Sequence, residues 1–263
     1  MSSGARGSRL LAGRVAMITG GGRGIGREIA LAYAAEGADV ALVARTAAEL
    51  EAVADESREL GVHALPLIAD IAVEADARRA VAETLRHYGR IDILVNNAGI
   101  TPGAAKGPIN TVLDVSVEFW ERMFAVNCHG AFLITREALP AMVQRESGCI
   151  ISITSKVANN PLAGNAPYGP SKAALEAFTR VVDTEFAAHG IRANLLHPGG
   201  PVATSVFNEH YQPFSGTVAA PDVIRGAAVW LASDGAAHVH GAVIDARVWS
   251  AQHAAPLIDA TNA

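Results

Sequence analysis

The chain has 263 residues, of which half are hydrophobic and 18% are charged, and its mean hydropathy is +0.23. This composition describes a well-buried globular protein and excludes a disordered or fibrous chain. The formal net charge of −5 gives no general attraction to phosphate backbones or anionic membranes, so we expect neither nucleic acid nor a membrane as a partner. The two cysteines show no paired spacing, no apolar run approaches the roughly 18 residues of a membrane helix, and residues 1–14 lack the apolar stretch of a secretory signal. We therefore expect a cytoplasmic protein.

Short apolar runs alternate with longer helical patterns along the chain. Seven runs have the composition of strands: 14–19, 39–44, 63–68, 91–96, 149–155, 191–197 and 241–245. The segments between the first six are long enough for crossover helices, and the runs are hydrophobic at nearly every position, as in a parallel sheet that is covered on both faces. The pattern predicts one α/β domain, doubly wound, with a mostly parallel seven-stranded sheet and helices on both faces. Ligands are then expected beyond the carboxyl ends of the strands.

A glycine-rich turn joins the first predicted strand to the first predicted helix. The stretch "TGGGRGIG" has the spacing T-G-x-x-x-G-x-G. Glycines let the backbone approach a pyrophosphate, whose charge meets the free N–H groups and the positive end of the helix dipole. The turn therefore predicts a dinucleotide site, and the alternative is a purely structural turn. The residues of the turn expected at this site are Gly20, Gly22, Arg23, Gly24, Ile25 and Gly26.

The end of the second predicted strand indicates which dinucleotide binds. A site for NAD usually has an acid there, whereas a site for NADP has an arginine. Asp39 begins the strand, and five residues at about 3.3 Å each put it roughly 16 Å from the carboxyl end. At that end, Arg45 can pair a 2′-phosphate and Thr46 can add a hydroxyl, while Arg23 in the glycine turn supplies a second positive charge. We expect NADP(H), with NAD(H) as the alternative; otherwise both arginines are solvated surface charges.

Tyr168 and Lys172 lie four positions apart at the predicted start of a helix. Residues at this spacing share a helix face. A free phenol with a pKa near 10 is only about 0.1% ionised at pH 7, and a nearby ammonium favours the phenolate. The pair therefore predicts proton exchange with an alcohol or carbonyl oxygen. The alternative is an interfacial tyrosine beside a lysine whose stem lies along apolar surface.

Two further polar residues fit the same chemistry. Ser155 ends the fifth predicted strand, where its hydroxyl can hold the carbonyl oxygen that the tyrosine protonates. Asn127 is polar within an otherwise apolar helical stretch. Its structural role would be a hydrogen bond that bridges backbone groups, and its functional role would be to hold a water beside Lys172.

Six features in order resemble the short-chain dehydrogenase/reductase family over about residues 10 to 246. They are "TGGGRGIG" (19–26), "NNAG" (96–99), Asn127, Ser155, "YGPSK" (168–172) and "PGGPVAT" (198–204). The resemblance implies a Rossmann-type fold in which Tyr168 is the general acid/base and Ser155 steadies the substrate oxygen. It also implies that Lys172 lowers the pKa of the tyrosine and binds the nicotinamide ribose, and that Asn127 keeps a proton-relay water. The three residues between tyrosine and lysine resemble the carbonyl-reducing branch of the family.

The resemblance also implies further cofactor contacts. Asp70 and Ile71 match the family's adenine contact, and "NNAG" matches the segment beside the adenine ribose. The Pro-Gly segment of the family covers the nicotinamide. The residues that match these two segments are Asn97, Ala98, Gly99, Pro198, Gly199, Val202 and Thr204.

The chain departs from the family at two places. "PGGPVAT" has one residue more than the usual Pro-Gly-x-Val-x-Thr, which affects the expected contacts of Val202 and Thr204 with the carboxamide. "DARV" (245–248) stands where the family commonly reads Asp-Gly-Gly, so subunit packing or the C-terminal path differs.

The expected organisation is one domain with two tails. Residues 1–10 form an N-terminal tail, 11–250 form the Rossmann-type domain with a substrate lid at about 200–221, and 251–263 form a C-terminal tail. We also expect residues 101–114 and the stretch after Asp245 to be irregular. The resemblance implies a homotetramer or dimer built partly from the helix that carries Tyr168.

The leading hypothesis is an NAD(P)(H)-dependent oxidoreductase that moves a hydride between nicotinamide and a secondary alcohol or ketone carbon. Phe207, Tyr211 and Phe214 in the predicted lid suggest a mid-sized apolar or aromatic small molecule as substrate. The alternatives are a nucleotide-sensing or scaffold protein without turnover, and an epimerase or dehydratase. No metal is expected, because "HVH" (238–240) offers two histidines without a third ligand at a plausible spacing.

Overall fold

A seven-stranded parallel sheet forms the centre of the computed structural model, which describes residues 9–105, 107–204 and 218–253. The strand order is β3-β2-β1-β4-β5-β6-β7, and every neighbouring pair is parallel. The strands are β1 (Val15–Thr19), β2 (Asp39–Ala44), β3 (Ala64–Ile68), β4 (Ile93–Asn96), β5 (Gly148–Ile153), β6 (Ile191–His197) and β7 (Val243–Asp245). This confirms the doubly wound α/β architecture that the apolar runs predicted.

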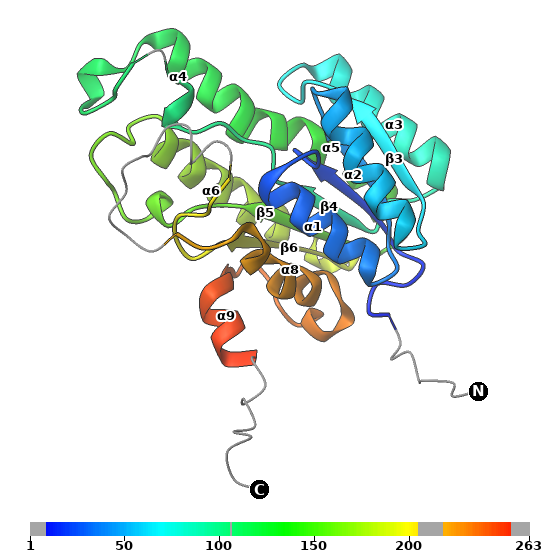
Figure 1. Cartoon of the computed structure of the whole chain (residues 1–263). Coiled ribbons are helices and arrows are strands. Elements are labelled where there is room, and N and C mark those ends of the chain that lie inside the picture. Colours follow the sequence, from blue (N-terminus) through cyan, green and yellow to red (C-terminus); the bar gives the residue numbers. More distant parts are fainter. Residues whose placement is uncertain (1–8, 106, 205–217, 254–263) are drawn as a thin grey trace, which may run out of the picture.

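Helices cover both faces of the sheet (Figure 1). Among the described residues they are α1 (Gly24–Ala35), α2 (Ala47–Glu59), α3 (Glu74–Tyr88), α4 (Val117–Phe124), α5 (Gly130–Gln144), α6 (Tyr168–Phe186), α8 (Arg225–Ala232) and α9 (Ala246–His253). A π-helical turn (Ala125–His129) joins α4 to α5, and short 3-10 turns complete the connections. None of the helices in the described ranges has the length and apolar character that crossing a membrane requires.

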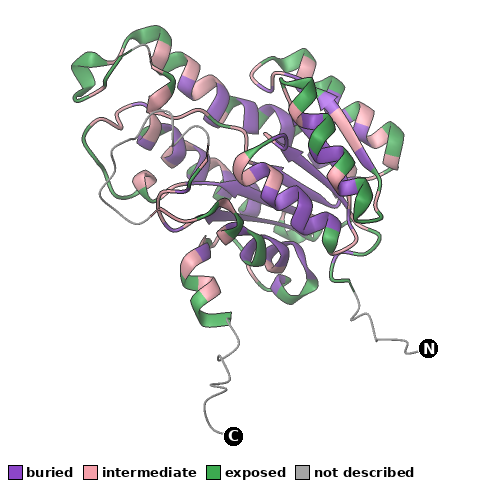
Figure 2. Ribbon diagram, viewed as in Figure 1, coloured by how far each residue is buried: buried purple, intermediate pink, exposed green. Residues whose placement is uncertain are grey.

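Two hydrophobic cores lie on opposite faces of the sheet, because successive side chains on a strand point to opposite sides. On β1, Ala16 and Ile18 pack in the core shared with α1, α2 and α8. Met17, between them, packs in the core shared with α3, α5 and α6. Figure 2 shows this burial along the strands and the inner sides of the helices. The strand order reverses between β1 and β4, which places the expected ligand crevice beyond their carboxyl ends.

The structure changes two expectations about segment boundaries. β5 ends at Ile153, so Ser155 lies just beyond the strand and does not end it. The expectation of an irregular stretch after Asp245 is wrong for residues 246–253, which form α9. The reason is local: Asp245 Oδ1 accepts the N–H groups of Arg247 (2.9 Å) and Val248 (3.2 Å) and caps the first turn. Most of the expected lid, with its three aromatic residues Phe207, Tyr211 and Phe214, lies outside the described residues.

Candidate active site

The glycine turn brings the start of α1 close to the end of β1. Gly20 has a φ of +66°, and a Cβ on Gly26 would lie 2.1 Å from the carbonyl oxygen of Gly20. Asn97 fastens the turn, since its Nδ2 donates to the carbonyl oxygens of Thr19 (2.9 Å) and Gly20 (3.2 Å). Arg23, the N-cap residue of α1, makes no side-chain capping hydrogen bond, so the start of this helix suits an anion that meets its first N–H groups and its dipole.

Three arginines and two acids lie together near the carboxyl end of β2, at the end of the cavity that is distant from Tyr168. Arg45 is 62% exposed and its guanidinium lies 3.9 Å from Asp70, while Arg122 binds Asp70 at 3.0 Å. Burial alone would raise the pKa of Asp70, but the N–H of Ala72 and the guanidinium of Arg122 outweigh it and the pKa is lowered. Arg23 lies 3.5 Å from Glu49. The lowered pKa keeps the Asp70 carboxylate ionised, and three arginines beside two acids leave the cluster with more basic than acidic side chains.

Asn127 clamps the backbone that follows β4. Its Oδ1 accepts the N–H of Ile100 (2.7 Å) and its Nδ2 donates to the carbonyl oxygen of the same residue (2.9 Å). Nδ2 also lies 3.1 Å from Ser171 Oγ, which in turn donates to the carbonyl oxygen of Tyr168 (2.8 Å). Asn127 lies in the π-helical turn, a local widening that is frequent at functional sites. The clamp is the bridging role that sequence offered as the structural alternative.

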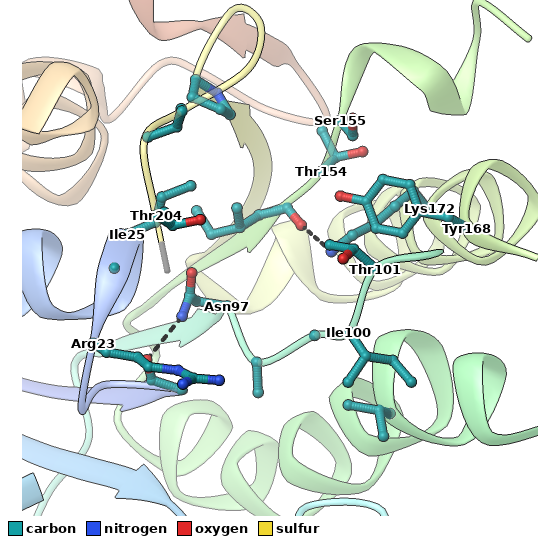
Figure 3. A pocket seen from close by; sticks show the side chains of 18 of the residues that line it. Arg23, Ile25, Asn97, Ile100, Thr101, Thr154, Ser155, Tyr168, Lys172 and Thr204 are labelled. Carbon is teal, nitrogen blue, oxygen red and sulfur yellow. Dashed lines mark hydrogen bonds between the residues drawn. The ribbon is translucent and has the colours of Figure 1, made fainter. Parts of the chain in front are cut away.

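Lys172 and Tyr168 share one face of α6, which begins at Tyr168 as expected. Lys172 is only 4% exposed, and its Nζ donates to the carbonyl oxygen of Ile153 at 2.7 Å. Burial lowers the pKa of Lys172 to about 8. The Nζ atom lies 5.9 Å from the centroid of the Tyr168 ring. The site therefore holds a desolvated ammonium beside a phenol (Figure 3).

Ser155 is positioned through its neighbours. The hydroxyl of Thr154 donates to Glu176 Oε1 at 2.7 Å, and Asn159 Nδ2 donates to Glu176 Oε2 at 2.9 Å. Glu176 is buried on α6, one turn beyond Lys172. One buried carboxylate thus ties both sides of Ser155 to the helix that carries Tyr168 and Lys172.

The two segments that depart from the family pattern, residues 198–204 and 245–248, contact each other. Arg247, at the place of a family glycine, donates from Nη2 to the carbonyl oxygen of Pro201 at 2.7 Å. A Cβ on Gly200 would lie 3.2 Å from this guanidinium, and one on Gly199 would lie 2.4 Å from Asp245 Oδ1. Both glycines have a positive φ, +85° at Gly199 and +154° at Gly200. The longer Pro-Gly loop therefore lies against α9, and glycine at its second and third positions makes the approach possible.

A cavity of about 950 Å³ extends from the glycine turn to Tyr168. The expected residues in its wall are Gly20, Gly22, Arg23, Gly24, Ile25, Arg45, Thr46, Asp70, Ile71, Asn97, Ala98, Gly99, Ser155, Tyr168, Lys172, Pro198, Val202 and Thr204. Gly26, Asn127 and Gly199 are expected site residues that do not line the cavity. Gly26 and Gly199 allow the close backbone approaches described above, and Asn127 holds the backbone at Ile100. Arg23 and Tyr168 stand at opposite ends (Figure 3).

Four residues that the sequence did not single out contribute to the site: Thr101, Arg122, Glu176 and Arg247. Glu176 follows Lys172 by four positions, so helical spacing could have indicated it. Arg247 stands where the resemblance leads one to expect a glycine, so this departure could have indicated it. Arg122 is 52 positions from its partner Asp70, and no local pattern joins them.

The wall fits a dinucleotide on two observations. Gly20, Gly22 and Gly24 line the cavity with backbone alone, which is the close backbone approach that a pyrophosphate requires. At the Tyr168 end, Thr101 Oγ1 lines the cavity and is buried without a hydrogen-bond partner among the described residues. Within the same residues, no group of three or more histidines, cysteines or acids could hold a metal ion, and His240 instead contacts Asp183 at 3.0 Å.

Comparison with known proteins agrees with this geometry. Residues 14–213 match the family model for short chain dehydrogenases. A short chain dehydrogenase of Pseudocercospora fijiensis is 37% identical over 189 residues, which cover 72% of this chain and 60% of that protein. The structure of 3-ketoacyl-(acyl-carrier-protein) reductase from Brucella melitensis complexed with NADH is 32% identical, with a TM-score of 0.81 over 89% of this chain and 97% of that chain.

A second solved structure is a candidate NAD(P) dependent gluconate 5-dehydrogenase from Beutenbergia cavernae with bound NADP at low occupancy. It is 36% identical, with a TM-score of 0.81 over 93% of this chain and all of that chain. The chain belongs to the short-chain dehydrogenase/reductase family, a family of NAD(P)-dependent oxidoreductases.

The glycine turn yields the first prediction. Gly26→Ala should destabilise the fold by an amount at the upper end of the roughly 1–3 kcal/mol typical of overpacking, because its Cβ would meet backbone and not a flexible side chain. Gly107→Ala is the matched control, since Gly107 is exposed and its Cβ would meet nothing within 4 Å. Denaturant unfolding measures both. Equal stability of the two variants would contradict the tight turn.

Proposed function

We propose that this protein is an NADP(H)-dependent oxidoreductase that interconverts a secondary alcohol and a ketone, with Tyr168 as general acid/base. The observation that carries the proposal is the buried Lys172, anchored to Ile153 beside the phenol at one end of a dinucleotide-sized cavity. Lys172 has no carboxylate partner among the described residues, and burying an ammonium in that condition is costly, which favours a chemical role over a scaffold role.

Lys172 would favour ionisation of the phenol at neutral pH. Its pKa of about 8 keeps the amine mostly protonated at pH 7, and the positive charge stabilises a phenolate nearby. Tyr168 would then accept the hydroxyl proton when an alcohol is oxidised and return it when a ketone is reduced. The chemistry that a bound nicotinamide supplies is hydride donation or acceptance.

Ser155 and Asn127 would take supporting roles. The Ser155 hydroxyl would hold the substrate oxygen, and the ties from Glu176 to Thr154 and Asn159 support this by fixing the turn around it. Asn127 would fix the backbone at Ile100 and keep a relay water near Lys172.

Two charge features support NADP(H) over NAD(H). Arg45 is exposed directly after β2, whose last residue is Ala44 and not an acid, and Thr46 follows it as the N-cap residue of α2. Arg23 adds a second guanidinium from the glycine turn. The two solved relatives described above bind NADH and NADP respectively, so the preference rests on these side chains. Asp70 and Ile71 would contact the adenine, and the loop from Pro198 to Thr204 would cover the nicotinamide.

The substrate would be a small carbonyl or alcohol compound. The wall near Tyr168 combines apolar Val157, Leu162 and Ala163 with polar Asn165 and Lys156, so it suits a molecule with both characters. We further propose a cytoplasmic homotetramer or dimer. Exposed apolar side chains on α5 and α6, Phe132 and Val181, support a subunit contact there.

Replacing Tyr168 tests the reaction. Tyr168→Phe should lower turnover by about 10²–10⁴-fold, because the proton is no longer exchanged, while NADPH affinity stays within about threefold. The assay follows NADPH oxidation with cyclohexanone and ethyl acetoacetate, and NADP⁺ reduction with gluconate. Unchanged turnover in the variant would contradict the role of Tyr168. Cofactor binding without turnover of any carbonyl or alcohol probe by the native protein would favour the nucleotide-sensing alternative.

Replacing Arg45 tests the cofactor. Fluorescence titration of the native protein should give at least about tenfold tighter binding of NADPH than of NADH, a difference of about 1.4 kcal/mol. Arg45→Asp should abolish the preference, because a carboxylate repels the 2′-phosphate. Arg86→Asp makes the same change of charge at an exposed position of α3 and should leave the preference for NADPH unchanged. Tighter binding of NADH by the native protein would overturn the NADP assignment.

A further inference from the structure

A second cavity, of about 330 Å³, lies at the opposite edge of the sheet from the cofactor cavity. Its wall includes Arg14 just before β1, Arg90 just before β4 and Arg192 at the start of β6. Because all strands are parallel, these amino ends are separated from the carboxyl ends by the length of the sheet. The cofactor cavity shares none of the residues that line this second cavity.

Arg192 is a buried cation without a counter-charge. It is 8% exposed, and its Nη2 donates to the carbonyl oxygen of Ser233 at 3.1 Å. Its Nη1 is buried and has no hydrogen-bond partner among the described residues, and none of their carboxylates forms an ion pair with it. A buried guanidinium that lacks an ion-pair partner destabilises the folded protein unless a bound anion neutralises its charge.

The other ionisable groups nearby do not neutralise Arg192. Asp92 is occupied by the N–H of Val15 (2.9 Å) and by the guanidinium of Arg90, and Asp234 by that of Arg14. Burial raises the pKa of the Cys149 thiol in the same wall, so it stays neutral and supplies no thiolate.

The cavity therefore carries a surplus of guanidinium donors. Three arginines and two acids line it, and Arg145 adds a fourth guanidinium 3.5 Å from Asp92. Arg90 Nε, like Arg192 Nη1, is buried without a partner in the described chain. Arg14, Arg90 and Arg192 line one cavity, and the guanidinium group is the side chain that best matches the oxygens of phosphate.

We propose that this cavity binds a phosphate-class oxyanion, either inorganic phosphate or a small phosphate monoester, that neutralises Arg192. Binding to the folded protein alone stabilises it by mass action, so the site couples stability to the concentration of the anion. It acts at a distance from the hydride-transfer site and does not depend on the function proposed above.

Thermal unfolding with increasing sodium phosphate, at an ionic strength held constant with sodium chloride, tests the site. The melting temperature of the native protein should rise and saturate. Arg192→Met should bind phosphate at least about tenfold more weakly, and Arg14→Gln should weaken binding as well. Arg86→Gln is the control, because Arg86 is exposed on α3 and does not line the cavity.

The comparison of variants separates this site from the cofactor cavity. Phosphate bound in the cofactor cavity would stabilise Arg192→Met and Arg86→Gln alike, and that result overturns the proposal. Absence of a saturable phosphate effect in the native protein also overturns it. If Arg192→Met does not fold, an equal response of Arg14→Gln and Arg86→Gln overturns it instead. Tighter binding of glycerol 3-phosphate than of phosphate would support the site and assign it to a monoester, and the reverse would assign it to the free ion.

Discussion

The hydrogen bond from the Lys172 ammonium to the carbonyl oxygen of Ile153 organises the site. Ile153 is the last residue of β5, and Lys172 stands one turn into α6, so the bond fixes the helix against the end of the strand. Glu176 repeats the connection one turn further along through Thr154. Together they set where Ser155 and Tyr168 lie, because both residues stand between the two anchored segments.

The same constraint reaches the rest of the cavity through backbone contacts. Asn127 joins the backbone after β4 to Ser171 on α6, and Asn97 joins the end of β4 to the glycine turn. Three segments of the cavity wall are thus linked by the amide side chains of Asn127 and Asn97. On the other side of the cavity, the Pro-Gly loop is held by Arg247 from α9.

The sequence was sufficient for the fold because the strands are buried on both faces and therefore read as continuous apolar runs. It also located most of the cavity wall, since a parallel sheet brings residues after different strands to one edge. It did not reveal that Arg122 binds Asp70 or that Arg247 binds Pro201, because these pairs depend on helix placement across long separations. It missed α9, which a single aspartate caps, and it left open the bridging role of Asn127 that the hydrogen bonds display.

The most direct test of this account is an NMR titration of the Lys172 side chain in the native protein without cofactor. The chain has three lysines, so comparison with Lys172→Met assigns the signal. Because the ammonium is desolvated, we expect a pKa of about 8 for Lys172. A pKa near the ordinary lysine value of about 10.4 would show a solvated amine and would contradict the central role given to Lys172.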